Sequence, residues 1–177
     1  MKFLIAAGGT GGHITPGIAI ANKLKELGNE VIFLGTSTGM ETDLVPKAGY
    51  DLKIIRAKGL IRGFSLKNIE IIKCLFDGIS DVKKIIEKEK PDMIIGTGGY
   101  VTAPAIIAAL QKKIPCMIHE SNALPGKTTM WLSKKVDVIA LGFEDAKKRL
   151  PKAKNAVYTG NPTKMSGNVD KQKIKEQ

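Results

Sequence analysis

Two short segments of this 177-residue chain combine paired glycines with a ring-bearing side chain in the same order. Residues 10–16 read Thr-Gly-Gly-His-Ile-Thr-Pro, and residues 97–104 read Thr-Gly-Gly-Tyr-Val-Thr-Ala-Pro. Adjacent glycines let the backbone approach a ligand closely, and a helix that starts just after them offers free N–H groups to an anion. Tight turning of the chain would also explain each glycine pair alone. The repetition of the whole pattern favours an anion site held from two sides, as a diphosphate would be.

The two histidines of the chain lie beside these features. His13 follows the first glycine pair, and an imidazole with a pKa of about 6.5 can accept a hydroxyl proton at neutral pH. His13 is therefore the candidate general base. His119 ends an apolar run, which predicts a buried, structural histidine. Glu120 and Asn122 follow it, and they either reach into a ligand crevice or cap the loop.

Better-known motifs fail when they are compared position by position. The dinucleotide pattern G-x-G-x-x-G requires a glycine where this chain has Ile14. A P-loop-like stretch at residues 121–128 begins with Ser121 instead of glycine, and Pro125 stiffens a loop that must wrap around phosphate. No group of His, Cys, Asp and Glu has metal-ligand spacing, and no G-x-S-x-G nucleophile motif occurs. The sequence predicts neither a metal nor another cofactor.

The elements that must position these residues alternate between short apolar runs and longer helical patterns, which favours parallel strands joined by helices. Strands are expected at residues 2–6, 30–34, 52–55, 92–95, 115–119, 136–140 and 156–158, and further helices at residues 40–48, 66–89, 103–111, 128–133 and 144–150. Thr15 is expected to cap the first helix, with Pro16 in its first turn and Gly28 at its end. The predicted fold is α/β, a Rossmann-like doubly wound parallel sheet. In such a sheet, ligands bind beyond the carboxyl ends of the strands.

Composition limits the class of protein. The chain has 28 Lys and Arg against 17 Asp and Glu, a net charge of +11, and 43% hydrophobic residues, as expected for one folded domain. With only two cysteines there is no disulfide framework, which predicts a reducing, cytoplasmic setting. The apolar run at residues 3–7 is too short for a signal peptide or a membrane span. Aromatic residues make up 5% and do not alternate with basic ones, which disfavours nucleic acid as a partner.

A segment at residues 61–76 is more apolar than one buried helix face requires and also carries lysines. Its candidate membrane patch comprises Ile61, Phe64, Leu66, Lys67, Lys73 and Phe76. Apolar insertion and lysine attraction add at an anionic bilayer, although a buried helix with a few lysines would give the same pattern. Residues 164–177 are polar and contain too few apolar residues to pack. We therefore expect a domain at residues 1–163, followed by an interdomain linker or a disordered tail.

Five segments together resemble one family. They are residues 8–17, 35–46, 96–101, 119–122 and 160–162, in order along nearly all of residues 1–165. They resemble the amino-terminal half of the MurG family, bacterial transferases that move N-acetylglucosamine from UDP onto undecaprenyl-diphosphoryl-muramoyl-pentapeptide (lipid I) and so make lipid II for peptidoglycan. The resemblance implies a two-domain GT-B enzyme that is inverting and metal-independent. It also implies a peripheral protein on the cytoplasmic face of the cell membrane.

The resemblance further implies roles for single residues. The turns at Gly11–Gly12 and Gly98–Gly99 would hold the diphosphate of the lipid-linked acceptor, and His13 would be the base, with Glu120 as its rival. Where the family usually has an arginine that contacts the donor phosphate, this chain has Lys164, which keeps the charge but not the planar fork. Thr10, Gly11, Gly12 and Asn122 would contact the UDP-GlcNAc donor. Tyr100 would line the crevice.

Three hypotheses about the chain follow. The first is the acceptor-binding half of such a transferase, inactive without the domain that supplies most of the UDP-GlcNAc pocket. The second is a membrane-associated subunit of a split transferase that recruits a separate donor-binding chain. The third is a stand-alone Rossmann-like protein that binds a sugar or a nucleotide.

Overall fold

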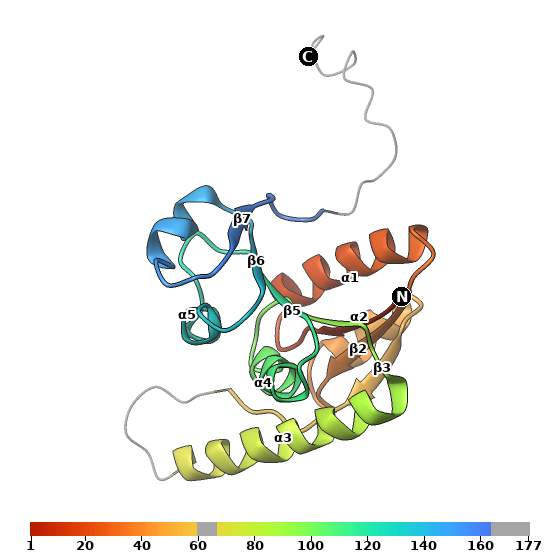
Figure 1. Cartoon of the computed structure of the whole chain (residues 1–177). Coiled ribbons are helices and arrows are strands. Elements are labelled where there is room, and N and C mark those ends of the chain that lie inside the picture. Colours follow the sequence, from red (N-terminus) through yellow and green to blue (C-terminus); the bar gives the residue numbers. More distant parts are fainter. Residues whose placement is uncertain (60–66, 164–177) are drawn as a thin grey trace.

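A computed structural model describes residues 1–59 and 67–163, with the backbone only at residues 67–69 (Figure 1). Seven strands form one sheet in the order β3-β2-β1-β4-β5-β6-β7, and all neighbours are parallel. The order reverses between β1 and β4, and this switch point is where doubly wound sheets bind ligands. The strands are β1 (Lys2–Ala6), β2 (Glu30–Gly35), β3 (Asp51–Ile54), β4 (Met93–Gly96), β5 (Cys116–Glu120), β6 (Val138–Leu141) and β7 (Ala156–Tyr158).

Helices cover both faces of the sheet. One face carries α1 (Gly11–Glu26) and α2 (Glu41–Lys47), whose apolar side chains pack with Phe3, Ile5 and Phe33. The other face carries α3 (Lys67–Glu89), α4 (Thr102–Lys112) and α5 (Lys127–Leu132), and α3 and α4 lie side by side there. A short 3₁₀ helix, η1 (Glu144–Arg149), connects β6 to β7.

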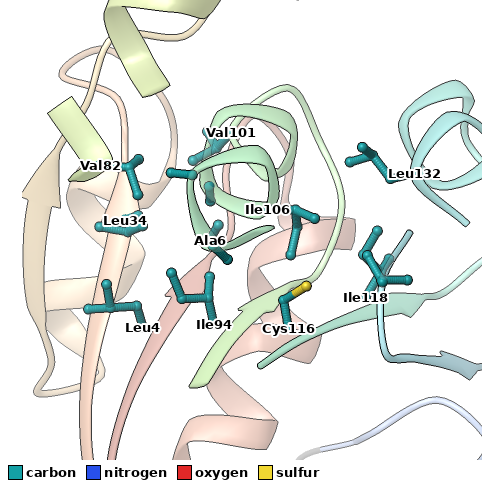
Figure 2. Packing of buried hydrophobic residues seen from close by; sticks show 14 of the residues in the cluster. Leu4, Ala6, Leu34, Val82, Ile94, Val101, Ile106, Cys116, Ile118 and Leu132 are labelled. Carbon is teal, nitrogen blue, oxygen red and sulfur yellow. The ribbon is translucent and has the colours of Figure 1, made fainter. Parts of the chain in front are cut away.

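The larger core lies between the sheet and the α3–α4–α5 layer. Figure 2 shows Leu4, Ala6 and Ile94 in the core that the sheet forms with α3 and α4, where Ile106 is fully buried. Successive side chains of a strand point to opposite faces, so Leu4 enters this core while Phe3 and Ile5 enter the other. Central parallel strands are covered on both faces, which is why they read as continuous apolar runs in the sequence.

The predicted doubly wound sheet is confirmed, with two local corrections. Thr15 does not cap the first helix: α1 already begins at Gly11, and the carbonyl of Thr10 accepts the N–H groups of His13 and Ile14 at 3.0 and 3.2 Å. The glycine pair is thus the first turn of the helix itself. The segment at residues 144–150 forms a 3₁₀ helix rather than an α-helix.

Some predictions fall outside the described part of the chain. These concern Ile61, Phe64, Leu66, Lys164 and the tail at residues 164–177, and only the backbone is described at Lys67. Within residues 1–59 and 67–163, none of the helices combines the length and apolar character that a membrane span requires.

Candidate functional site

The two glycine turns meet at the switch point of the sheet. They follow β1 and β4, which are neighbours, so both lie at the same edge. The hydroxyl of Thr97 donates to the carbonyl of His13 at 2.8 Å. The imidazole of His13 lies directly against Gly98 and Gly99, because a Cβ built on Gly98 would collide with the ring and one on Gly99 would lie 3.2 Å from Nδ1. The structure therefore brings the two turns into one crevice.

The first turn is open. A Cβ built on Gly11 would meet no heavy atom of the described chain within 4 Å, and Gly12 is exposed. Among the described residues, no acceptor pairs with the N–H of Gly11 or of Gly12, and the side chain of the N-cap Thr10 does not cap the helix. The first N–H groups of a 16-residue helix are thus available to a ligand. This turn has the features of an anion site.

The second turn is crowded. Gly98 and Gly99 have φ angles of +113° and +75°, a region that favours glycine. The N–H of Gly98 donates to Oγ1 of Thr102 at 3.1 Å, and the Thr102 hydroxyl donates to the Gly98 carbonyl at 2.8 Å. The N–H of Gly98 is therefore occupied, contrary to the expectation that this pair would offer its amides to a diphosphate. Both glycines instead leave room for the ring of His13.

His13 stands between the open turn and a cavity. Its Nδ1 is hydrogen-bonded to Oγ1 of Thr10 at 3.3 Å, and the side chain is half-buried. The position, with the ring fixed by Thr10 on one side and by Gly98 and Gly99 on the other, is suitable for a base that accepts a proton from a bound hydroxyl.

Glu120 is buried and caps the loop that follows β5. Its Oε1 accepts the N–H and the side-chain amide of Asn122 at 3.0 and 2.9 Å. Its Oε2 accepts the N–H of Gly126 at 2.9 Å and the hydroxyl of Thr129 at 2.6 Å. Both alternatives that the sequence left open for Glu120 are met, because it caps the loop and also lines the cavity described below. Both oxygens of the Glu120 carboxylate are thus engaged by this loop, which they hold in position.

His119 is buried, as predicted. Its Nδ1 lies 3.3 Å from Oγ of Ser121, and among the described residues its Nε2 has no hydrogen-bond partner. Burial lowers the pKa of His119, so the neutral form is favoured. A second anchor joins the same loop to the end of the domain, because Asn161 donates to the carbonyl of Ser121 at 3.2 Å.

Glu41 is a site residue that the sequence analysis missed. Its carboxylate is fully buried and accepts the N–H of Gly9 at 3.1 Å and both the N–H and the hydroxyl of Thr36 at 2.8 Å. Burial alone would raise the pKa of Glu41, but these hydrogen bonds outweigh it and hold the pKa below the ordinary value. Thr36 in turn lies 3.5 Å from the hydroxyl of Tyr100.

Glu41 thereby connects three loops of the crevice. The only signal in the sequence is an acidic residue just after a glycine-rich stretch, at Gly35 and Gly39. A Cβ on either glycine would collide with the Glu41 side chain, so the glycines make room for the buried carboxylate.

A cavity of about 500 Å³ extends from His13 to the α3–α4–α5 layer. Of the predicted site residues, it is lined by His13, Gly98, Gly99, Tyr100, Glu120 and Asn122. Thr10, Gly11 and Gly12, which precede His13 in the chain, are not part of the lining. In the described ranges no three His, Cys, Asp or Glu side chains are grouped as metal ligands.

Comparison with known proteins places this site in a family. The family model described as "Glycosyltransferase family 28 N-terminal domain" matches residues 3–141, which include both glycine turns, Glu41 and Glu120. The chain belongs to glycosyltransferase family 28. The predicted resemblance to the family is thus confirmed, and the fold is that of the amino-terminal domain of a GT-B glycosyltransferase.

Similar proteins and a solved structure also support the membership of this chain in family 28. Proteins of Acetivibrio thermocellus and of Lactococcus lactis subsp. cremoris (strain MG1363) are 44% and 47% identical over 164 residues, 92% of this chain. Both are named UDP-N-acetylglucosamine–N-acetylmuramyl-(pentapeptide) pyrophosphoryl-undecaprenol N-acetylglucosamine transferase. The crystal structure of Acinetobacter baumannii MurG superposes with a TM-score of 0.76 at 30% identity over 92% of this chain. The chain spans less than half of these proteins, 44%, 46% and 46% of their lengths.

Proposed function

We propose that this chain is the acceptor-binding half of an N-acetylglucosaminyltransferase, and that its acceptor is lipid I. The observation that carries the proposal is the open first turn of α1, with the free N–H groups of Gly11 and Gly12 beside the imidazole of His13. A transferase that uses a diphosphate-linked acceptor needs an anion site within reach of a base. The names of the relatives supply the substrate pair, UDP-N-acetylglucosamine and a pyrophosphoryl-undecaprenol.

In the proposed mechanism His13 takes the proton from the muramoyl hydroxyl. The hydroxyl oxygen forms a bond to the anomeric carbon of N-acetylglucosamine, and the bond from that carbon to the UDP oxygen breaks, with inversion and without a metal. The N–H groups at the start of α1 hold the acceptor diphosphate, and Thr10, Gly11, Gly12 and Asn122 lie at the edge that would face the donor. Glu120 is a positioning residue, because its hydrogen bonds fix the loop that carries Asn122.

The donor site is the part of the proposal that lies mostly beyond this domain. We expect a second domain to supply most of the UDP-GlcNAc pocket, and we expect Lys164 to lie near the donor phosphate. Residues 1–163 alone should therefore bind the acceptor without catalysing the transfer. A split transferase, in which a partner chain carries the donor half, predicts co-purification with a UDP-binding polypeptide.

A membrane location is also part of the proposal. Phe76 is 67% exposed on α3, and Lys73 is exposed beside it. Apolar insertion and lysine attraction would hold such a surface at the cytoplasmic face of the membrane as a peripheral protein.

The test joins this chain to the carboxy-terminal half of the Acetivibrio thermocellus relative and measures transfer from UDP-N-acetylglucosamine to a lipid I analogue. We expect His13→Gln to lower kcat about 10²- to 10⁴-fold, because a base is lost, with little change in the KM for the acceptor. The matched control, His119→Gln, changes a buried histidine outside the cavity and should reduce kcat far less. Sustained turnover by the 177-residue chain alone would refute the proposed division of labour.

A further inference from the structure

The cavity beside His13 has two chemically different ends. The polar end carries the imidazole of His13, the glycine turn and the loop fixed by Glu120. The rest of the lining, called here the apolar end, is built from three helices. Its apolar lining residues are Ile71, Ile72 and Leu75 of α3, Ala103 and Pro104 of α4, and Trp131 of α5. A volume of about 500 Å³ is in the range of pockets that hold a small molecule.

The described residues leave the apolar end partly open. Ile72 and Trp131 are 54% and 52% exposed, although both line the cavity. Contiguous exposed apolar surface on a folded domain marks a place where something apolar binds. Ile72 lies one helical turn from Phe76, so the open side of the cavity continues onto the exposed surface of α3.

Two lysines, Lys58 and Lys127, also line the cavity. Lys127 begins α5, and no carboxylate of the described residues lies within ion-pair distance of it. Lys58 lies 3.9 Å from Glu70, a long contact between two exposed side chains that screening by water makes weak. An apolar pocket with cations in its lining is complementary to an amphiphile that carries an anionic head group.

We infer that the apolar end of this cavity binds the first isoprene units of the acceptor, directly beyond its diphosphate. This inference rests on the proposed function, and it adds that the protein, rather than the bilayer, holds the start of the polyprenyl chain. The diphosphate then lies at the His13 end, and the remaining isoprene units leave over Ile72 and Phe76 toward the membrane.

The chain contains its own probe, because Trp131 is the only tryptophan and lines the cavity. We would titrate the chain with dimethylallyl, geranyl and farnesyl diphosphate below their micelle concentrations, with inorganic diphosphate and geraniol as controls. We expect a blue shift of the Trp131 emission with the prenyl diphosphates and none with inorganic diphosphate. Affinity should rise at least tenfold from dimethylallyl to geranyl diphosphate, since each buried CH₂ contributes about fourfold. The gain per isoprene unit should fall once the chain leaves the cavity over Ile72, and geraniol should bind more weakly than geranyl diphosphate.

Two variants test the location. Ala103→Met fills the cavity. Ile72→Glu places a charge at a half-exposed lining position, where the fold can accommodate it. Each variant should weaken the binding of geranyl diphosphate at least tenfold. The matched control Ser80→Glu adds the same charge at an exposed position of the same helix outside the lining, and it should leave the affinity unchanged.

The outcomes separate this inference from the proposed function. If all prenyl diphosphates bind as inorganic diphosphate does, the lipid subsite is wrong and the anion site stands. If affinity rises with chain length but neither variant reduces it, the ligand partitions elsewhere and the subsite is again wrong. If no diphosphate compound of any length binds the folded chain, the proposed acceptor site itself fails.

Discussion

The two Thr-Gly-Gly turns have nearly the same sequence and opposite surroundings. At the first turn α1 begins at Gly11, so the glycines are helical, open and rich in free N–H groups. At the second turn α4 begins only at Thr102, so Gly98 and Gly99 precede the helix in left-handed conformations beneath the ring of His13.

The side chain at the equivalent threonine makes the difference. Thr102 is buried and its hydroxyl bonds to both backbone groups of Gly98, whereas its counterpart Thr15 is exposed on α1. One turn therefore leaves its backbone N–H groups free, and the other uses its glycines to make room for the ring of His13. A repeated motif identifies the site but does not assign the same role to each copy.

The largest expected effect separates the two turns by stability. Gly99→Ala should cost at least about 2 kcal/mol, because its Cβ would collide with the carbonyl of Gly8 at a φ that disfavours alanine. Gly11→Ala should change stability by less than about 1 kcal/mol, because the space around it is open. Urea unfolding of both variants checks this comparison. Equal losses would mean that the two turns are built alike.

The next effect concerns the carboxylate that supports the first turn. Glu41→Ala should cost about 1–3 kcal/mol, because the buried donors of Gly9 and Thr36 lose their acceptor. Asp43→Asn is the matched control on the same helix, and its exposed carboxylate should contribute less than about 0.5 kcal/mol. If Glu41→Ala lowers the free energy of unfolding no more than Asp43→Asn does, Glu41 does not support the first turn.

Lowering the pH should distinguish the supports of the two turns. Since the pKa of Glu41 is lowered in the folded chain, the stability it contributes is present above its unfolded pKa and is lost as the pH falls through its folded pKa. The penalty of Glu41→Gln should therefore shrink between pH 7 and about pH 3.5. The penalty of Thr102→Val should stay constant, because the hydroxyl does not titrate. Urea midpoints at both pH values check the two trends, and parallel trends would contradict the account.

The smallest effect is expected at Gly12. Because Gly12 is exposed, Gly12→Ala should change the free energy of unfolding by less than about 1 kcal/mol. The substitution should nevertheless weaken the binding of inorganic diphosphate several-fold, because a methyl group would crowd the anion. Isothermal titration checks the second effect; unchanged affinity would place the anion elsewhere.

The fold was predictable from the sequence because buried parallel strands are apolar runs separated by glycine and polar turns. The positions of His13 and of the two turns followed from strand ends alone. The role of Glu41 did not, because the donors to its carboxylate and their neighbours come from three loops that only the folded sheet brings together. The start of α1 was misplaced because Thr15 and Pro16 have the composition of a helix start, while the carbonyl of Thr10 begins the helix five residues earlier. The cavity escaped prediction because its lining comes from segments as distant as Lys58 and Trp131.

The most direct test of the central claim is an amide titration. The ¹⁵N-labelled chain is titrated with inorganic diphosphate, and the backbone N–H shifts are followed by nuclear magnetic resonance. The open-turn account predicts that the shifts of Gly11 and Gly12 are the largest and saturate together, while the N–H of Gly98, which is bonded to Thr102, moves little. Largest shifts at Gly98, or binding that leaves Gly11 and Gly12 unmoved, would contradict it.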